Sequence, residues 1–175
     1  MHDSANDMIR IRSLNENDSA YFSDEECKQG WHSTPDKLNR RLLDEKEGRC
    51  KTFAAEVNGQ GAGYVSLYFQ PETGAFANQG IPEIVDFAVL EKFRCRGVGA
   101  KLMDAAEEAA SRVCDRVYLG VGLHAGYGSA QRMYVKRGYI PDGSGVWYRD
   151  HVCEPYSACE NDDDLVLYMS KELKK

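Results

Sequence analysis

Residues 93–101 read FRCRGVGAK and hold the residue types best suited to bind a charged ligand. Gly97 and Gly99 allow a tight turn and let a ligand approach the bare backbone. A helix is expected to begin at Gly97, so its first N–H groups lack helical partners and the positive end of its dipole lies behind them. Arg94 and Arg96 add charge-assisted donors. This segment is therefore suited to bind a pyrophosphate.

Other nucleotide-binding motifs fit the chain less well. The P-loop pattern G-x-x-x-x-G-K-[ST] is absent from the sequence. A dinucleotide fingerprint that began at Gly97 would need a small residue at position 102, where Leu102 stands. Residues 120–125, GVGLHA, match G-x-G-x-x-A, but the next helix is expected only near Ser129, too late for that motif. Taken alone, the turn at residues 94–100 (the phosphate turn) fits an anion site and a structural turn equally well.

Hydrophobic periodicity and turn residues predict the elements that position this turn. Ser33 to Asp36 carries helix-start signals, Gly48 is a helix stop, and Asn58-Gly59 between two alternating runs predicts a hairpin. The expected strands cover residues 8–14, 50–57, 63–69, 83–90, 116–123 and 164–171. The expected helices cover one or two segments within residues 16–48, and then residues 97–113 and 129–137. The order β-α-(α)-β-β-β-α-β-α-β predicts an α/β (α+β) fold with a central mixed sheet flanked by helices.

The composition restricts the class of protein and its partners. A chain of 175 residues is expected to form a single domain, residues 1–175. Its 22 basic and 28 acidic side chains leave a net charge of −6, which argues against a nucleic-acid partner. No apolar run approaches the roughly 20 residues of a membrane span, and the first residues lack the layout of a secretory signal. We therefore expect a cytoplasmic protein with no membrane partner.

The six cysteines are expected to be reduced thiols. They form no C-x-x-C pair and stand at no finger-like spacing from a histidine, and a chain of this size needs no disulfide to complete its core. Cys153 and Cys159 beside His151 form one weak candidate for a metal site, for which a surface loop is the competing interpretation. We therefore expect no metal.

Three motifs, taken together with their order and spacing, resemble the GNAT superfamily of acetyl-CoA-dependent N-acetyltransferases. The phosphate turn, R-x-x-G-x-G-A from residue 94, fits that family's Q/R-x-x-G-x-G/A signature. Residues 83–89, EIVDFAV, look like its fourth strand, and residues 130–139, AQRMYVKRGY, resemble its A-x-x-L-Y-x-x-x-G-F helix. The order of elements also agrees from residue 8 to residue 171. The resemblance implies a GNAT-like, mostly antiparallel central sheet and acetyl-CoA as co-substrate.

The resemblance also implies roles for individual residues. Backbone groups of Phe87, Ala88 and Val89, beside a bulge in the strand, would pair with the pantetheine arm of acetyl-CoA. Tyr134 would protonate the leaving thiolate, and Glu83 stands where the histone-acetylating branch of the family has its catalytic carboxylate. The pyrophosphate would be bound by the seven residues of the phosphate turn, Arg94, Cys95, Arg96, Gly97, Val98, Gly99 and Ala100.

The chemistry of acetyl transfer supports this division of roles. An alkylammonium has a pKa of about 10.4, and it attacks a thioester only after losing its proton. A positioned carboxylate such as Glu83 can accept that proton, and backbone N–H groups can stabilise the oxyanion that the attack creates. No enzyme nucleophile is needed, and Cys95 lies in the phosphate turn, so direct transfer in a ternary complex is expected.

Each assignment has a competing interpretation. Tyr134 could be an ordinary core residue. On a regular strand Glu83 and Asp86 point to opposite faces, so only one of them should serve as the base. Tyr127 stands where many relatives have an asparagine, which leaves that contact with the cofactor open. The histidines, His124 among them, are expected to be structural or solvated.

The acceptor is expected to be a primary amine on a small molecule or a protein. Residues 20–36 and 140–160 would form its wall, and their aromatic side chains either line an amine pocket or simply pack. These side chains are Tyr21, Phe22, Trp31, Trp147, Tyr148 and Tyr156. The alternative function is a non-catalytic acyl-CoA-binding sensor, which would need only the phosphate turn, and a different nucleotide-binding fold is a third interpretation. A homodimer is also compatible with the sequence.

Overall fold

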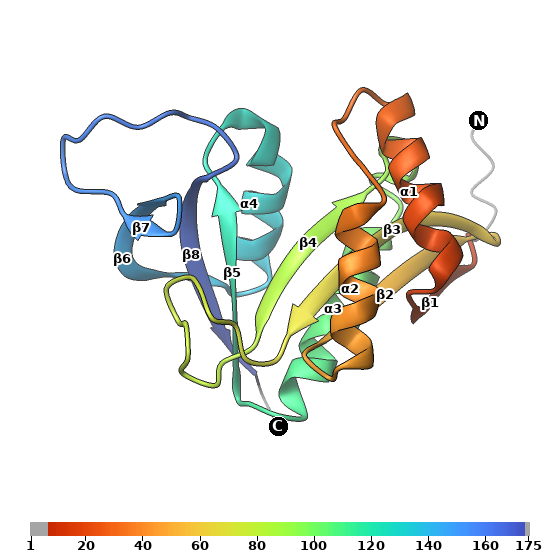
Figure 1. Ribbon diagram of the computed structural model, residues 1–175, viewed down its shortest axis with the longest axis horizontal. Helices are drawn as coiled ribbons and strands as arrows, with labels where there is room; N and C mark the ends of the chain where they lie inside the picture. The colour runs from red at the N-terminus through yellow and green to blue at the C-terminus, as the bar shows by residue number, and fades with distance from the viewer. Residues whose placement is uncertain (1–6, 174–175) are drawn as a thin grey trace. The chain divides into compact units, whose positions relative to one another are not determined.

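The computed structural model describes residues 7–173 (Figure 1). Its strands are β1 (Ile9–Ser13), β2 (Cys50–Val57), β3 (Gln60–Tyr68), β4 (Glu83–Val89), β5 (Arg116–Gly122), β6 (Ile140–Tyr148), β7 (His151–Val152) and β8 (Leu165–Glu172). Its helices are α1 (Glu16–Lys28), α2 (Asp36–Lys46), α3 (Val98–Ser111) and α4 (Gly128–Lys136), with the short 3-10 turns η1 (Glu91–Phe93) and η2 (Ala125–Tyr127). Every predicted strand and helix is present.

Within the described residues, the strands hydrogen-bond in the order β1-β2-β3-β4-β5-β8-β6-β7. β4 and β5 run parallel, with Glu83 opposite Tyr118. The pairs β1–β2, β2–β3, β5–β8, β8–β6 and β6–β7 are antiparallel. The predicted α/β fold with a mixed, mostly antiparallel sheet flanked by helices is therefore confirmed.

The chain forms two compact units. The first unit comprises residues 7–68 and 86–109, and the second unit comprises residues 69–85 and 110–173. The phosphate turn belongs to the first unit, whereas Glu83 and Tyr134 belong to the second. That residues 1–175 act as a single domain stays a prediction.

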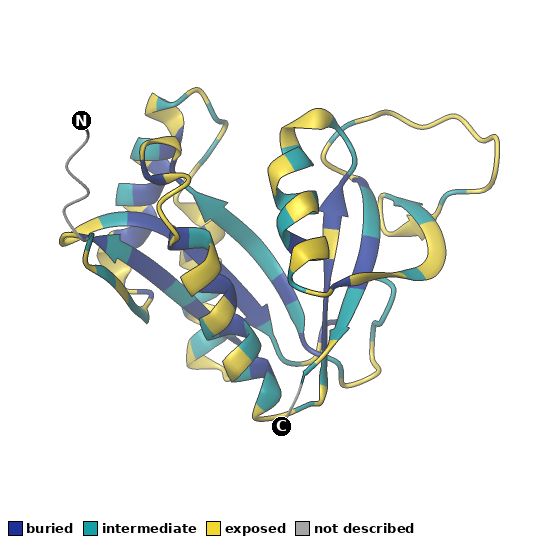
Figure 2. Cartoon of the chain, turned by 180° about the vertical axis from the view of Figure 1, so that it is seen from behind, coloured by how far each residue is buried: buried dark blue, intermediate teal, exposed yellow. Residues whose placement is uncertain are grey.

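Helices α1 and α2 of the first unit pack against each other and against β3 and β2, respectively. Phe22 of α1 and Tyr64 of β3 are fully buried, and their ring centroids lie 5.0 Å apart. Most residues of β2 and β3 are buried or half-buried, and they form the centre of this unit (Figure 2). This core supports the N-terminal residues of α3 and the segment between α1 and α2.

The apolar residues Val98, Leu102 and Ala106 recur at helical spacing along α3 and are buried. The helix was expected over residues 97–113, but α3 ends at Ser111 and Val113 is 61% exposed. Because Val98 is buried within the phosphate turn, the start of the helix is anchored in the core. Residues 94–97 of the turn remain at the surface.

The predicted hairpin is confirmed, with a shorter turn than expected. Asn58 and Gly59 have φ values of 52° and 83°, as a two-residue type I′ turn requires. The register pairs Val57 with Gln60, so β3 begins at Gln60, where the sequence indicated a longer turn that ran through Gly61. Two left-handed residues suffice to reverse the chain here.

Residues 140–160 contain two strands, β6 and β7, that the sequence did not reveal. β6 is largely exposed, and its pairing with β8 is interrupted between Pro141 and Val146. Gly143 and Gly145 lie within that interruption with φ values of 88° and 86°. Because few β6 side chains are buried and the strand bulges, no alternation of apolar and polar residues marks it.

Helix α1 was also weakly marked in the sequence, because several of its buried residues are polar. Asp18 and Glu26 are 4% and 3% exposed. The Asp18 carboxylate accepts hydrogen bonds from the Asn15 backbone at 2.7 Å and from both terminal nitrogens of Arg12. The Glu26 carboxylate accepts hydrogen bonds from the hydroxyl of Tyr64 and, at 2.5 Å, from that of Ser33. These bonds compensate for burying the carboxylates.

Candidate active site

The phosphate turn leaves β4 through η1 and enters α3. Residues 94–97 are exposed, and Cys95 and Gly97 have φ values of 58° and 84°. The first hydrogen bond of α3 joins the N–H of Lys101 to the carbonyl of Gly97 at 3.2 Å, so the N–H groups of residues 98–100 have no acceptor within the helix. Left-handed turns that lead into a helix N-terminus form concavities that bind anions.

The two arginines of the turn are held differently. Arg96 Nε donates to the carboxylate of Asp7 at 2.7 Å. Arg94 lies over the ring of Trp31, with Cζ 5.5 Å from the ring centroid, and its Nη1 is 3.6 Å from Glu91. The Arg94 side chain is 50% exposed. Because the carboxylate contact of Arg94 is longer and exposed, Arg94 is the better placed of the two to bind a phosphate.

The C-terminal half of β4 is not a regular strand. Asp86 has a φ of 53°, which is uncommon for a residue with a side chain, and residues 87–89 follow it half-buried. A Cβ on Gly63 would lie 2.4 Å from the carbonyl oxygen of Ala88, so glycine permits a close approach to this segment. The expectation that Glu83 and Asp86 point to opposite faces assumed a regular strand, and the left-handed Asp86 removes that premise.

Glu83 and Asp86 have different partners. Asp86 accepts a hydrogen bond from Arg41 Nε of α2 at 2.5 Å, and the two side chains are 15% and 22% exposed. In the second unit, burial raises the pKa of Tyr118, and the charge of Glu83 and a hydrogen bond with its carboxylate raise it further. Asp86 is thus engaged in an ion pair with α2, and Glu83 contacts a hydroxyl.

Tyr134 lies on α4, is 5% exposed, and has its ring centroid 5.8 Å from that of Tyr139. Burial, with a smaller contribution from Tyr127, raises the pKa of Tyr134. Its hydroxyl is therefore protonated at neutral pH, as a proton donor must be. A core tyrosine would be buried in the same way, so the role of Tyr134 as catalytic acid stays a prediction.

A polar cluster near the start of α4 had no signal in the sequence. The hydroxyl of Tyr127 donates to Asp163 Oδ1 at 2.9 Å, and His124 Nε2 lies 3.0 Å from the same oxygen. Burial, and then the hydrogen bond to Asp163, raises the pKa of Tyr127 to about 12. A Cβ on Gly122 would lie 2.3 Å from the Tyr127 ring. The residue that replaces the relatives' asparagine is therefore held by Asp163, across an interval of 36 residues.

The aromatic candidates for the acceptor wall have different environments. Phe22 is fully buried, and the Tyr21 hydroxyl donates to the carbonyl of Gly61 at 2.9 Å. Trp147 Nε1 donates to Ser144 Oγ at 2.7 Å. Tyr156 is fully exposed. Phe22 therefore packs in the core, whereas Trp147 and Tyr148 are half-buried and Tyr156 is open to solvent.

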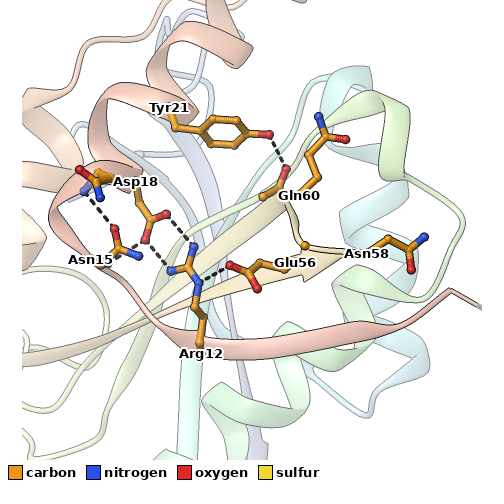
Figure 3. Close-up of a pocket in the computed structure, with 10 residues that line it drawn as sticks. Arg12, Asn15, Asp18, Tyr21, Glu56, Asn58 and Gln60 are labelled. Carbon is orange, nitrogen blue, oxygen red and sulfur yellow. Dashed lines mark hydrogen bonds and ion pairs between the residues drawn. The ribbon is translucent and has the colours of Figure 1, made fainter.

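A polar pocket of about 400 Å³ lies in the first unit, beside the β2–β3 hairpin (Figure 3). Arg12 forms its centre and bridges the carboxylates of Asp18 and Glu56, at 2.7 and 2.6 Å. Tyr21 lies at its edge and points to the hairpin (Figure 3). None of the predicted catalytic or cofactor-binding residues lines this pocket. Its charged groups satisfy one another, which indicates a structural network.

Two other kinds of feature, a metal site and a membrane-spanning helix, are absent from residues 7–173. No group of three or more His, Cys, Asp or Glu side chains in that range is arranged to hold a metal ion. No helix in the same range is long and apolar enough to cross a membrane.

Comparison with known proteins gives one family and a set of similar structures. The profile of the Acetyltransferase (GNAT) family matches residues 12–139. No curated protein sequence matches the chain significantly. A proposed GNAT acetyltransferase from Desulfovibrio desulfuricans is similar with a TM-score of 0.71 and 14% identity, over 94% of this chain and 99% of that one.

Two other crystal structures share the fold. One is YncA, a proposed acetyltransferase from Salmonella typhimurium solved with acetyl-CoA, with a TM-score of 0.68, 15% identity and 95% coverage of both chains. The other is the ribosomal-protein-S18-alanine N-acetyltransferase of Escherichia coli, with a TM-score of 0.66, 14% identity and 96% coverage of both chains. At these identities the similarity establishes the fold.

Proposed function

We propose that this chain, which belongs to the GNAT family of acetyltransferases, uses acetyl-CoA to acetylate a primary amine by direct attack in a ternary complex. The observation that carries the proposal is the phosphate turn. It is exposed, contains two left-handed residues, leads into the N-terminus of α3 and lies within the segment that matches the family. We also propose that residues 1–175 form one acetyltransferase domain.

The residues of the turn fit the pyrophosphate of acetyl-CoA. The N–H groups of residues 98–100 and the half-exposed guanidinium of Arg94 provide donors. A Cβ on Gly97 would meet no atom closer than Ile9 Cδ1, at 3.8 Å, so the glycine is needed for its backbone conformation, which directs these donors, and not for space. Bound acetyl-CoA would supply the thioester carbonyl that the amine attacks.

Different residues of the chain would bind the cofactor, accept the proton of the amine and donate a proton to the leaving thiolate. The backbone of Phe87, Ala88 and Val89 would hold the pantetheine arm. Glu83 would accept the proton of the incoming ammonium group, directly or through water. Tyr134 would donate a proton to the departing thiolate, because its hydroxyl, like that of any tyrosine, is protonated at neutral pH.

The acceptor would be a primary amine on a small molecule or a protein, and charge supports a cationic one. Residues 140–164 hold seven acidic side chains and one arginine, whereas the rest of the chain holds 21 acidic and 21 basic side chains. The net charge of −6 therefore resides in residues 140–164, to which the segment expected to form part of the acceptor wall, residues 140–160, contributes −3. The E. coli relative acts, by its name, on an alanine of a ribosomal protein, which supports including protein amines.

Calorimetric titration with CoA and thiol release from acetyl-CoA test the proposal together. The amines supplied would be a polyamine, free amino acids, and peptides with either a free α-amine or a lysine side chain. We expect CoA binding and turnover with at least one class. Binding without turnover on any of them would favour the acyl-CoA sensor. No binding of CoA would overturn the proposed function.

A further inference from the structure

The segment between α1 and α2, residues 29–35, contacts the phosphate turn directly. It was expected to form part of the acceptor wall, with Trp31 among the amine-binding candidates. In the first unit, however, Trp31 packs against Arg94, whose Cζ lies 5.5 Å from the indole ring centroid. Next to it, Gln29 Oε1 accepts a hydrogen bond from the backbone N–H of Glu91 at 3.0 Å. Side chains of this segment therefore contact both the turn and η1, which precedes it.

The same segment is anchored to the core on its other side. The backbone N–H of Trp31 donates to the carbonyl of Glu26 at 2.9 Å, and Ser33 Oγ donates to the Glu26 carboxylate at 2.5 Å. Glu26 also accepts a hydrogen bond from the buried Tyr64 hydroxyl. The backbone of Trp31 is thus anchored to α1 through Glu26, whereas Arg94 projects from a surface turn.

A guanidinium whose Cζ lies over an aromatic ring is attracted by the π-electrons of the ring and uses none of its five N–H donors in that contact. The carbonyl of Val89 accepts from Arg94 Nε at 3.4 Å and limits rotation about the end of the side chain. An arginine held in this way loses less conformational entropy when it binds a phosphate than a freely rotating one.

We infer that Trp31 is a positioning residue that holds Arg94 ready for the pyrophosphate of acetyl-CoA. This inference rests on the proposed function, because Arg94 is there a ligand of the pyrophosphate. Trp31 would then contribute to cofactor binding and not to the acceptor wall. Trp31 acts through Arg94 and touches no reacting atom.

The first test is a double-mutant cycle on CoA affinity, measured by calorimetry with purified full-length protein. We expect Trp31→Ala to weaken CoA binding about two- to fivefold, the range that an exposed cation–π contact supports. Trp31→Phe, which keeps a flat ring, should stay within about twofold of the wild type. In an Arg94→Ala background, Trp31→Ala should have no further effect on CoA affinity.

Two controls separate positioning from general damage. Lys92→Ala removes an exposed ion pair with Glu25, 2.6 Å long, from the same contact between α1 and η1, and it should leave CoA affinity nearly unchanged. In a Trp147→Phe background Trp31 is the sole tryptophan of the chain. Its fluorescence should change when CoA binds, and this change should disappear when Arg94 is replaced by alanine.

The outcomes distinguish the inference from the proposed function. If Trp31→Ala weakens CoA binding equally with and without Arg94, Trp31 does not act through that residue and the inference is wrong. It is also wrong if Trp31→Ala changes the KM of the acceptor and leaves CoA affinity intact, because Trp31 then belongs to the acceptor wall. If the wild-type protein binds no CoA, the proposed function itself fails.

Discussion

The phosphate turn of the first unit and the surroundings of Tyr134 in the second unit prepare chemical groups in opposite ways. In the turn the groups are backbone N–H donors and an arginine, and residues 94–97 are exposed. Around Tyr134 the group is a single hydroxyl on a side chain that is 5% exposed. Backbone conformation produces the first arrangement, through the positive φ of Cys95 and Gly97. Burial produces the second, because it raises the pKa of the phenol.

Because of this difference, the two regions should be sensitive to different kinds of substitution. The backbone donors of the turn depend on its φ values, and Arg94 is its one side-chain donor. A buried hydroxyl tolerates small changes around it and fails when one oxygen is removed. Substitutions in the two regions should therefore separate cofactor binding from turnover.

The largest effect is expected at Tyr134. Tyr134→Phe should lower kcat about 10²-fold or more, because a positioned proton donor contributes at least that much, while CoA affinity stays within about twofold. Thiol release and calorimetric titration measure the two quantities. An unchanged kcat would remove Tyr134 from the acid role and leave it as a core residue packed on Tyr139.

Next in size is the replacement of Glu83. Glu83→Gln should lower kcat about 10²-fold near neutral pH. Because the neutral amine alone can then react, the rate should keep rising with pH towards the pKa of the acceptor amine, about 10.4 for an alkylamine. The pH–rate profile of the variant against the wild type measures this change.

Asp86→Asn is the matched control for Glu83→Gln. Its main effect should fall on stability, because it breaks the charged hydrogen bond with Arg41, and urea unfolding should show a loss of about 1.5–3 kcal/mol. If this variant, and not Glu83→Gln, changes the shape of the pH–rate profile, the base is Asp86.

A smaller effect is expected when the glycine of the phosphate turn at position 97 is replaced. Gly97→Ala should weaken CoA binding about tenfold and destabilise the fold by about 1–2 kcal/mol, because an alanine at a φ of 84° is strained. Gly48→Ala, at a φ of 73° after α2 and with no atom within 4 Å of the added Cβ, carries the same strain far from the turn. It should cost similar stability and leave CoA affinity unchanged, whereas equal losses of affinity would refute the role of the turn.

The smallest effect is expected on the free energy of unfolding at high pH. The pKa of native Tyr134 is raised above its unfolded value of about 10, so above pH 10 the unfolded chain loses a proton that the native chain keeps. The free energy of unfolding should therefore fall as pH increases above 10, with a contribution from Tyr134 that approaches about 1.4 kcal/mol per pH unit. Urea unfolding between pH 9 and 11 measures the slope, and it should be shallower for Tyr134→Phe. Equal slopes would show that Tyr134 ionises normally.

Local signals made most of the fold predictable from the sequence. The hairpin at Asn58-Gly59 and the strand-turn-helix around residues 83–111 depend on preferences of neighbouring residues, which act within a few positions. β6 was not predictable, because an exposed, bulged strand carries no alternation. Helix α1 was only partly predictable for a related reason, because its buried residues include the polar Asp18 and Glu26.

The sequence by itself determined the order of the elements other than β6 and β7, and the spacing of the phosphate turn, because glycine conformation and the polarity of a helix N-terminus are local properties. Tertiary structure alone decided the partners of the functional side chains. Arg41 reaches Asp86 across 45 residues, and Trp31, from the segment between α1 and α2, contacts Arg94 of the phosphate turn. Such contacts depend on how several elements pack together, and that packing is determined by the burial of the whole core and not by any single segment.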